Sequence, residues 1–275
     1  MRCVHHSQGD GSFVRLRAFV VIPAYNEADR LPQLLQELAG ALPPEAQAAG
    51  VDVHVCIVDD GSRQEQFAAE ERLTRDAGFG DAVRLVRLET NRGKGGAILA
   101  GLEIGLAEGF DYLGFMDADG AVPVRELYRA LVYLVTAHRD AGVTGVVGSR
   151  VRMLGRLVQR NPFRHFLGRA FATFVSAWFS QAVYDTQCGL KIFERETLRR
   201  HLRIPEDTRW VWDTQLLLSM LHAGESVHEL PVDWRETGDS KVSLIRDPLT
   251  MIWHLVRFRR RLRAISAASR RPELL

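Results

Sequence analysis

Five short apolar runs, each ending in a polar or glycine-rich motif, constrain the fold of this 275-residue chain more than any other feature. They alternate with segments whose apolar residues recur at helical spacing. The expected strands are 18–22, 51–58, 82–88, 112–116 and 143–147, and the expected helices are 27–42, 63–77, 95–108 and 124–138. Continuous apolar strands separated by helices are typical of a mainly parallel sheet that helices cover on both faces. The predicted fold class is therefore α/β.

The chain after residue 150 follows a different pattern. We expect amphipathic helices within 154–183, an extended piece at 185–193, a helix at 213–223, a strand at 226–232 and a basic helix at about 247–265. We therefore predict one domain over residues 16–246, with a nucleotide half at 16–150 and an acceptor half at 151–246. A flexible tail (1–15) is expected before it, and a basic amphipathic helix and tail (247–275) after it.

Composition excludes several classes of protein. The net charge is +2, and no nucleic-acid-binding motif accompanies the basic C-terminal segment, so we expect no nucleic-acid partner. Three cysteines, an odd number, argue against a disulfide scaffold and suit a reducing cytoplasm. No stretch reaches the about 18 apolar residues of a membrane span, and the N-terminal residues lack the apolar core of a secretory signal. We expect a cytoplasmic protein, soluble or peripheral on the cytosolic membrane face; the sequence does not define an oligomeric state.

A polar or glycine-rich motif follows each of the five expected strands. The motifs are Pro-Ala-Tyr-Asn-Glu (23–27), Asp-Asp-Gly-Ser (59–62), Asn-Arg-Gly-Lys-Gly-Gly (91–96), Asp-Ala-Asp-Gly (117–120) and Gly-Ser-Arg (148–150). Right-handed crossovers bring the carboxyl ends of parallel strands to one edge of the sheet, where such folds bind ligands. We therefore expect all five motifs to face one crevice.

Two carboxylates, Asp117 and Asp119, stand two residues apart after the fourth strand. On extended backbone such residues point the same way, and carboxylates this close resist joint ionisation unless a cation relieves their repulsion. Oxygen ligands favour Mg²⁺ or Mn²⁺, completed by phosphate and water. The pair therefore predicts a divalent-cation site. For Asp119 the alternative is a turn or helix cap with Gly120.

Two further motifs suit a nucleotide. Segment 91–97 opens a helix, where backbone N–H groups and Lys94 attract phosphate, although it lacks the spacing of a P-loop or a dinucleotide fingerprint. Asp60 can accept hydrogen bonds from a base or a ribose hydroxyl. The alternatives are an ordinary tight turn for 91–97, a turn and helix cap at Asp60, and a first-turn helix residue at Glu27.

Taken together, four of these stretches resemble the family-2 glycosyltransferases with the GT-A fold. They are VVIPAYNEADRLPQLL, IVDDGS, NRGKGGAILAGLEIG and MDADGA. The resemblance extends from Phe19 to about Arg263. The downstream stretches VVGSRV, DTQCGLKIF, WVWDTQLL and DWRETGDSKVS are similar to the dolichyl-phosphate β-glucosyltransferase branch, a relative of dolichyl-phosphate mannose synthase.

The resemblance implies a role for individual residues. Those implied around the nucleotide sugar are Pro23, Ala24, Tyr25, Glu27, Asp60, Lys94, Asp117 and Ala118, with Asp60 at the base. Asp119 is implied as the main metal ligand, with Asp117 beside it. Those implied around the acceptor phosphate and the sugar are Ser149, Arg150, Gln187, Lys191, Trp212, Ser240 and Lys241. Asp213 is implied beneath the transferred sugar, and the catalytic set is Asp213, Asp119 and Arg150.

The implied reaction is a metal-dependent, inverting transfer of a hexose, glucose from UDP-glucose, to a polyprenyl or dolichyl phosphate. A lipid phosphate is already an anion and needs arginine positioning more than a base. A soluble hydroxyl acceptor, such as a natural product or a cell-surface glycan precursor, would instead need Asp213 as general base. A nucleotidyltransferase and a non-catalytic nucleotide-sugar-binding protein are further alternatives. Two departures concern the lipid acceptor: the eukaryotic members carry an N-terminal membrane anchor that we do not expect here, and Gln215 stands where the family usually has an acidic residue.

The segments 249–263 and 163–179 suit helices that lie on an anionic membrane surface. In the first, Ile252, Leu255, Val256 and Leu262 fall near one side, with Trp253 and Phe258 flanking them and arginines between. Arginine-rich amphipathic helices of this kind bind anionic lipid surfaces. The alternative is that both helices pack on the sheet and leave their arginines in solvent.

Overall fold

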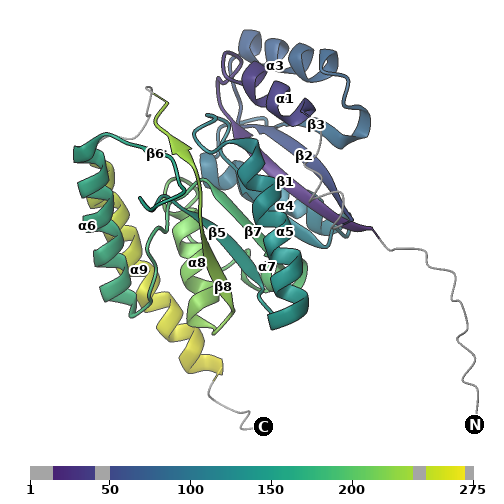
Figure 1. Ribbon diagram of the computed structural model, residues 1–275. Coiled ribbons are helices and arrows are strands. Elements are labelled where there is room, and N and C mark those ends of the chain that lie inside the picture. The colour runs from purple at the N-terminus through teal and green to yellow at the C-terminus, as the bar shows by residue number, and fades with distance from the viewer. Residues whose placement is uncertain (1–14, 41–49, 238–245, 270–275) are drawn as a thin grey trace, which may run out of the picture.

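The computed structural model describes residues 15–40, 50–237 and 246–269, and these form a sheet with helices on both faces (Figure 1). The strand order in the central sheet is β3-β2-β1-β4-β7-β5-β8. The strands are β1 (Leu16–Ala24), β2 (Val51–Asp59), β3 (Val83–Arg87), β4 (Tyr112–Met116), β5 (Gly145–Ser149), β7 (Leu190–Glu194) and β8 (Val227–Pro231). A separate ribbon pairs β6 (Val158–Gln159) with β9 (Trp234–Arg235).

Helices and one 3-10 turn connect these strands. They are α1 (Leu31–Ala39), α3 (Gln64–Asp76), η1 (Gly80–Ala82), α4 (Lys94–Ala107), α5 (Val124–Ala141), α6 (Pro162–Phe179), α7 (Arg195–His201), α8 (Trp212–His222) and α9 (Arg246–Ser269). Within the described residues, no helix is long and apolar enough to cross a membrane.

The strand directions confirm the predicted mainly parallel sheet. β1 pairs in parallel with β2 and β4, β2 with β3, and β5 with β8. β7 alone runs antiparallel to both of its neighbours, β4 and β5. Because β7 is reversed between them, β4 and β5 still point the same way, and their carboxyl ends reach the same edge of the sheet as those of β1, β2 and β3.

Helices cover both faces of the sheet because both faces of its strands are apolar. On one face, Leu31 of α1 and Leu127 of α5 pack against Val20 and Ile22 of β1. On the other face, Ile98 and Leu102 of α4 pack against the alternate residues of the same strand. α4 lies unusually close to β1, since a Cβ added at Gly101 would stand 2.6 Å from Val21. Close packing of this kind fixes the start of α4, and with it the glycine-rich segment, relative to the sheet edge.

A third apolar cluster joins α6, α8 and α9, which lie side by side in Figure 1. It contains Val175 of α6 and Leu218 of α8. The α9 residues in it are Met251, Leu255, Phe258 and Leu262. Of the apolar residues that we expected on a membrane, Leu255, Phe258 and Leu262 are therefore buried in the protein, whereas Ile252 and Val256 are partly buried and Trp253 is 53% exposed. The prediction that Leu255 and Leu262 face lipid was wrong, because an amphipathic pattern does not distinguish a protein core from a bilayer.

Other sequence predictions differ from the structure at their boundaries. The helix expected at 27–42 begins at Leu31, because residues 25–30 form the loop that carries the first polar motif. The short helix α7 and the ribbon β6–β9 were not predicted. The tail expected at 1–15 lies outside the described residues, apart from Arg15.

Candidate active site

A cavity of about 770 Å³ opens at the carboxyl edge of the sheet. The loops after β1, β2, β3 and β4 line one end of it, and residues of α6, α8 and α9 line the other. Twelve of the predicted site residues line this cavity: Pro23, Ala24, Tyr25, Glu27, Asp60, Lys94, Asp117, Ala118, Asp119, Arg150, Gln187 and Asp213. The single crevice expected from the topology is therefore present.

The loop after β1 presents Tyr25 and Glu27 to the cavity and is held from behind by the start of α3. Asn26 adopts a left-handed backbone conformation with φ of 51°. Its N–H donates to Ser62 Oγ at 2.8 Å, and its Oδ1 accepts from the Arg63 N–H at 3.1 Å. These bonds offset the cost of the left-handed conformation and fix where Tyr25 and Glu27 lie.

A buried carboxyl group lies directly behind this loop. Glu70 of α3 is fully buried, and its Oε1 accepts from the Glu27 N–H at 3.1 Å. Burial raises the pKa of Glu70 to about 7, and the carboxylates of Asp59 and Glu27 act in the same direction. Glu70 therefore changes its charge near neutral pH beneath a loop that lines the cavity.

Asp60 links the second and third loops. Its Oδ1 accepts from the Arg92 N–H at 2.7 Å, and its backbone carbonyl accepts from Asn91 Nδ2 at 3.1 Å. Burial raises the pKa of Asp60, although the backbone N–H groups of Arg92 and Gly93 partly oppose this. The carboxyl still borders the cavity, so it can accept a hydrogen bond from a ligand there.

Lys94 is the first residue of α4, and its ammonium reaches across to the fourth loop. Its Nζ lies 2.6 Å from Asp117 Oδ1. Burial disfavours the charged ammonium, but the carboxylates of Asp117 and Asp213 outweigh it, and the pKa of Lys94 is raised. A positive charge at a helix N-terminus, between two carboxylate positions, suits a phosphate group.

Ionisation of Asp119, the second carboxylate of the predicted metal pair, is disfavoured. Burial raises the pKa of Asp119, and the nearby Asp117 carboxylate raises it further. Asp119 Oδ1 also accepts from the Ala121 N–H at 3.0 Å, which fixes the carboxyl at the cavity wall. Gly189 packs directly behind this site, since a Cβ added there would lie 2.2 Å from Asp117 Oδ2. A cation between the two carboxylates would relieve their repulsion.

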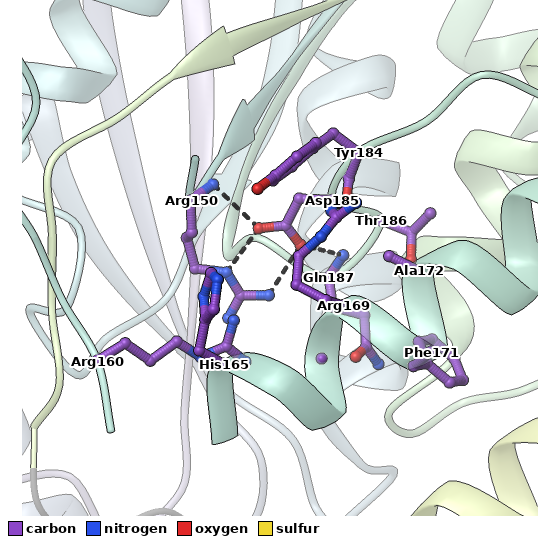
Figure 2. Close-up of a pocket in the computed structure, with 11 residues that line it drawn as sticks. Arg150, Arg160, His165, Arg169, Phe171, Ala172, Tyr184, Asp185, Thr186 and Gln187 are labelled. Carbon is purple, nitrogen blue, oxygen red and sulfur yellow. Dashed lines mark hydrogen bonds and ion pairs between the residues drawn. The ribbon is translucent and has the colours of Figure 1, made fainter. Parts of the chain in front are cut away.

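The Asp185 carboxylate holds Arg150 through three hydrogen bonds. Asp185 Oδ2 accepts from Arg150 Nε at 2.6 Å and from the Arg150 N–H at 3.0 Å, and Oδ1 accepts from Nη2 at 2.8 Å (Figure 2). Burial alone would raise the pKa of Asp185, but the Arg150 guanidinium lowers it to about 2. The result is a rigid ion pair that fixes the guanidinium at the cavity wall.

Further basic side chains surround this pair in a pocket of about 20 Å³ beside the main cavity. Figure 2 shows Arg160, His165 and Arg169 around the Arg150–Asp185 pair. Arg169 Nη1 donates to the Tyr184 carbonyl at 2.6 Å. Burial lowers the pKa of His165, and the neighbouring arginines lower it further. This part of the site therefore has a positive electrostatic potential that favours an anion.

Asp213 lies in the first turn of α8 and is held by a buried ion pair. Lys191 Nζ lies 2.8 Å from Asp213 Oδ2 and also donates to the Cys188 carbonyl at 2.8 Å. Asp213 Oδ1 accepts from the Thr214 N–H at 2.7 Å. Asp213 borders the cavity, whereas Lys191 is fully buried behind it.

The far end of the cavity is apolar. It is lined by Leu167, Ala170, Phe171 and Phe174 of α6, Met251 and Ile252 of α9, and Trp210. These residues continue directly from the basic pocket, since Phe171 borders both. The arrangement can therefore hold a molecule that joins an anionic head to an apolar chain.

Three predicted site residues in the described part of the chain do not line the cavity. Ser149 and Trp212 are buried, and Lys191 is buried behind Asp213, with which it forms an ion pair. Trp212 packs edge-on against Phe115 in the core, which explains its burial. The expectation that these three line the acceptor pocket was wrong. Ser240 and Lys241 lie outside the described residues.

Several cavity residues were not predicted from the sequence. Arg160 was not singled out, and the apolar residues of α6 were expected on a membrane surface and not at the cavity. Trp210 and Asp185 were noted only as parts of motifs, and Asp185 was not predicted as the partner of Arg150. The excess of arginine over acidic residues between 150 and 170 is the sequence signal that could have found Arg160 and Arg169.

Gln215, which stands where the family usually has an acidic residue, holds the loop before α8. Its Oε1 accepts from the Glu206 and Asp207 N–H groups at 2.8 and 3.0 Å. The same loop packs on the glycine-rich segment, because the Thr208 carbonyl accepts from the Gly96 N–H at 3.0 Å. An acidic side chain could accept the same two bonds. Gln215 is buried away from the cavity, so this departure leaves the cavity's chemistry unchanged.

The chain is similar to known glycosyltransferases in sequence and in fold. Residues 19–202 match the family model "Glycosyl transferase family 2". A dolichyl-phosphate beta-glucosyltransferase of Trichomonas vaginalis is 33% identical over 229 residues, which are 82% of this chain and 65% of that protein. The Drosophila melanogaster dolichyl-phosphate beta-glucosyltransferase is 34% identical over 252 residues, 86% of this chain and 74% of that protein.

A solved structure supports the fold assignment. Glucosyl-3-phosphoglycerate synthase from Mycobacterium tuberculosis, in complex with Mn²⁺, uridine diphosphate and glucosyl-3-phosphoglycerate, superimposes with a TM-score of 0.63. The match covers 89% of this chain and 80% of that one at 16% identity, so it shows a shared fold. The same enzyme has also been solved with Mg²⁺ and uridine diphosphate.

Proposed function

The chain belongs to glycosyl transferase family 2, and from this premise we propose that it transfers glucose from UDP-glucose to a polyprenyl phosphate, with inversion at the anomeric carbon. One observation carries the proposal. A single cavity joins a carboxylate and lysine end, suited to a nucleotide diphosphate, to a basic pocket and an apolar arm, suited to a lipid phosphate.

The donor end has groups for each part of a nucleotide sugar. Asp60 borders the cavity where a base or ribose can donate to its carboxyl. Lys94, at the start of α4, can contact the diphosphate once a ligand competes with Asp117 for its ammonium. The M. tuberculosis enzyme, which shares the fold, has been solved with uridine diphosphate bound.

The residues present also fit a divalent cation. Asp117 and Asp119 border the cavity, and the raised pKa of Asp119 reflects burial and the charge of Asp117. Within the described residues no cluster of three or more His, Cys, Asp or Glu side chains forms a complete metal cage. Two protein carboxylates with diphosphate oxygens and water are the usual ligand set for Mg²⁺ or Mn²⁺. When bound, the cation would neutralise charge that develops on the leaving diphosphate.

The acceptor end suits a phosphate that carries an apolar chain. Arg150 is fixed by Asp185, and Arg160, His165 and Arg169 surround the same small pocket. Planar guanidinium groups bind phosphate oxygens in pairs with defined geometry. The apolar arm between α6 and α9 gives the first isoprenoid units a place beside the head group.

The chemistry of such an acceptor needs little proton transfer. One phosphate oxygen attacks the anomeric carbon as the bond from that carbon to the diphosphate oxygen breaks, which inverts the configuration. Because the attacking oxygen is already anionic, positioning by Arg150 matters more than a base. Asp213, held by Lys191 and the Thr214 N–H, keeps a fixed carboxylate at the cavity wall that can accept hydrogen bonds from sugar hydroxyls.

The test follows label from UDP-glucose into lipid. Purified protein is incubated with Mg²⁺ or Mn²⁺, labelled UDP-glucose, and polyprenyl phosphate in detergent, with GDP-mannose as the competing donor. We expect lipid-dependent label in the organic phase and stoichiometric UDP release. UDP release that needs a soluble hydroxyl acceptor and is unaffected by lipid would contradict the proposal and would make Asp213 the candidate general base.

A further inference from the structure

The loop between β5 and α6 exposes apolar side chains to an unusual degree. Leu154 is 98% exposed, and Met153 and Leu157 beside it are 51% and 49% exposed. Phe163 and Phe166 on the first turns of α6 are 63% and 72% exposed. These five residues fall within fourteen consecutive positions. Large apolar side chains exposed this close together in the sequence are typical of a segment that contacts a partner.

The loop that carries Leu154 is firmly anchored at its base. Arg152 Nη2 donates to the Arg160 carbonyl at 2.9 Å and so closes the loop, and the Arg156 N–H donates to the Met153 carbonyl at 3.2 Å at its tip. The Leu157 N–H donates to Asp233 Oδ1 at 2.9 Å, and the β6–β9 ribbon follows. At the tip, a Cβ added to Gly155 would meet nothing within 4 Å. An anchored loop therefore projects an apolar tip away from the protein.

The excess of arginine in this part of the chain indicates the kind of partner that the segment contacts. From Val151 to Tyr184 the chain has five arginines and no Asp or Glu. Arg156 is balanced by ion pairs with Glu126 and Asp233, whereas Arg152 stands exposed on the loop. Leucine, methionine and phenylalanine interleaved with arginine suit the interface of an anionic bilayer, where apolar side chains enter the acyl region and arginines contact lipid phosphates.

We propose that the 152–166 segment docks on an anionic lipid bilayer by inserting Leu154, Met153 and Phe163. The proposal rests on the lipid acceptor proposed above. The segment begins two residues after Arg150 and contains Arg160, and both of these arginines border the basic pocket. Docking through this segment places the pocket at the level of the lipid phosphates. The segment overlaps the start of the 163–179 helix expected on a membrane, and it exposes more apolar side chains than α9, in which Leu255, Phe258 and Leu262 are buried.

The test compares single charge insertions in vesicle co-sedimentation. The probes are vesicles of phosphatidylglycerol with phosphatidylcholine, and of phosphatidylcholine alone. Leu154→Asp removes an apolar side chain that makes no core contact, and Leu154→Ser does so without adding charge. The matched control is Ala68→Asp at an exposed position of α3, which Figure 1 places at the opposite end of the molecule from α6.

We expect wild type and Ala68→Asp to bind the anionic vesicles equally. Leu154→Asp and Leu154→Ser should bind about 10- to 100-fold more weakly, the factor that burial of one leucine side chain supplies. All four proteins should transfer glucose equally to a short-chain lipid phosphate in detergent. Equal vesicle binding by Leu154→Asp and wild type, equal binding to both vesicle types, or a Leu154-dependent dimer would overturn the proposal. If the wild type transfers no glucose in detergent, the proposed function is refuted. That outcome is separate from the vesicle result, because sedimentation does not depend on glucose transfer.

Discussion

Lys191→Met tests whether Asp213 depends on a buried ion pair. Lys191 is fully buried and Asp213 nearly so, with 2.8 Å between Nζ and Oδ2. Methionine has a similar length but no charge, so the variant leaves the Asp213 carboxylate without its cation. Removing one partner of a buried pair costs about 3–5 kcal/mol, because the remaining charge is uncompensated. For a chain of this size the loss corresponds to a fall of about 6–20 °C in melting temperature.

The assay is a thermodynamic cycle of Lys191→Met, Asp213→Asn and the double variant, with denaturant unfolding and glucose transfer measured on each. We expect the double variant to lose less free energy of unfolding than the sum of the losses of the two single variants. The difference, which is the coupling between the two side chains, should be about 1–3 kcal/mol. Transfer should fall in Lys191→Met even where the protein is folded, because the carboxylate loses its fixed orientation. Additive stabilities together with wild-type transfer in Lys191→Met would refute the assigned role of this pair.

Three other perturbations have equally direct outcomes. Asp119→Asn should lower kcat/KM by at least about 100-fold and abolish cation-dependent UDP binding in calorimetry, and retained binding would contradict the metal site. Gly189→Ala should impair transfer without unfolding the protein, since its Cβ would lie 2.2 Å from Asp117 Oδ2; unchanged kinetics would show that the carboxylate moves freely. The pKa of Glu70 is about 7 in the folded protein, against an ordinary value of 4.5, so between these pH values the folded protein binds a proton that the unfolded chain has released. The free energy of unfolding should therefore fall as pH rises from about 4.5 to 7. Glu70→Gln, which can still accept from the Glu27 N–H, should flatten this pH dependence in denaturant titrations, and an unchanged profile would exclude Glu70 as its source.

Much of the structure of residues 16–150 could be predicted from the sequence, because the strands there are continuous apolar runs and each polar motif follows a strand directly. β4 was predicted with its observed limits, and β1 and β2 differ only by one or two residues at their ends. The direction of β7 could not be predicted. Its residues, Leu-Lys-Ile-Phe-Glu, suit a strand of either direction, and only its pairing between β4 and β5 fixes the reversal.

The structure after residue 150 was harder to predict for a physical reason. A lysine in a motif is expected in solvent or at a ligand, yet Lys191 is buried because Asp213 and the Cys188 carbonyl compensate its charge. The apolar stripe of α9 suits a bilayer and a protein core equally well, and only the packing of α6 and α8 decides between them. The exposed apolar tip at Leu154 has no periodic pattern, so the sequence alone does not reveal it.

The most direct test of the central claim uses two acceptors that differ in one group. The protein receives labelled UDP-glucose and either a polyprenyl phosphate or the corresponding polyprenol, in the same detergent and with the same cation. Because Arg150 and its basic neighbours select a phosphate, we predict glucosylated lipid from the phosphate only, with transfer strongly reduced in Arg150→Lys. Equal transfer to the neutral alcohol, or an Arg150→Lys variant as active as the wild type, would contradict the account.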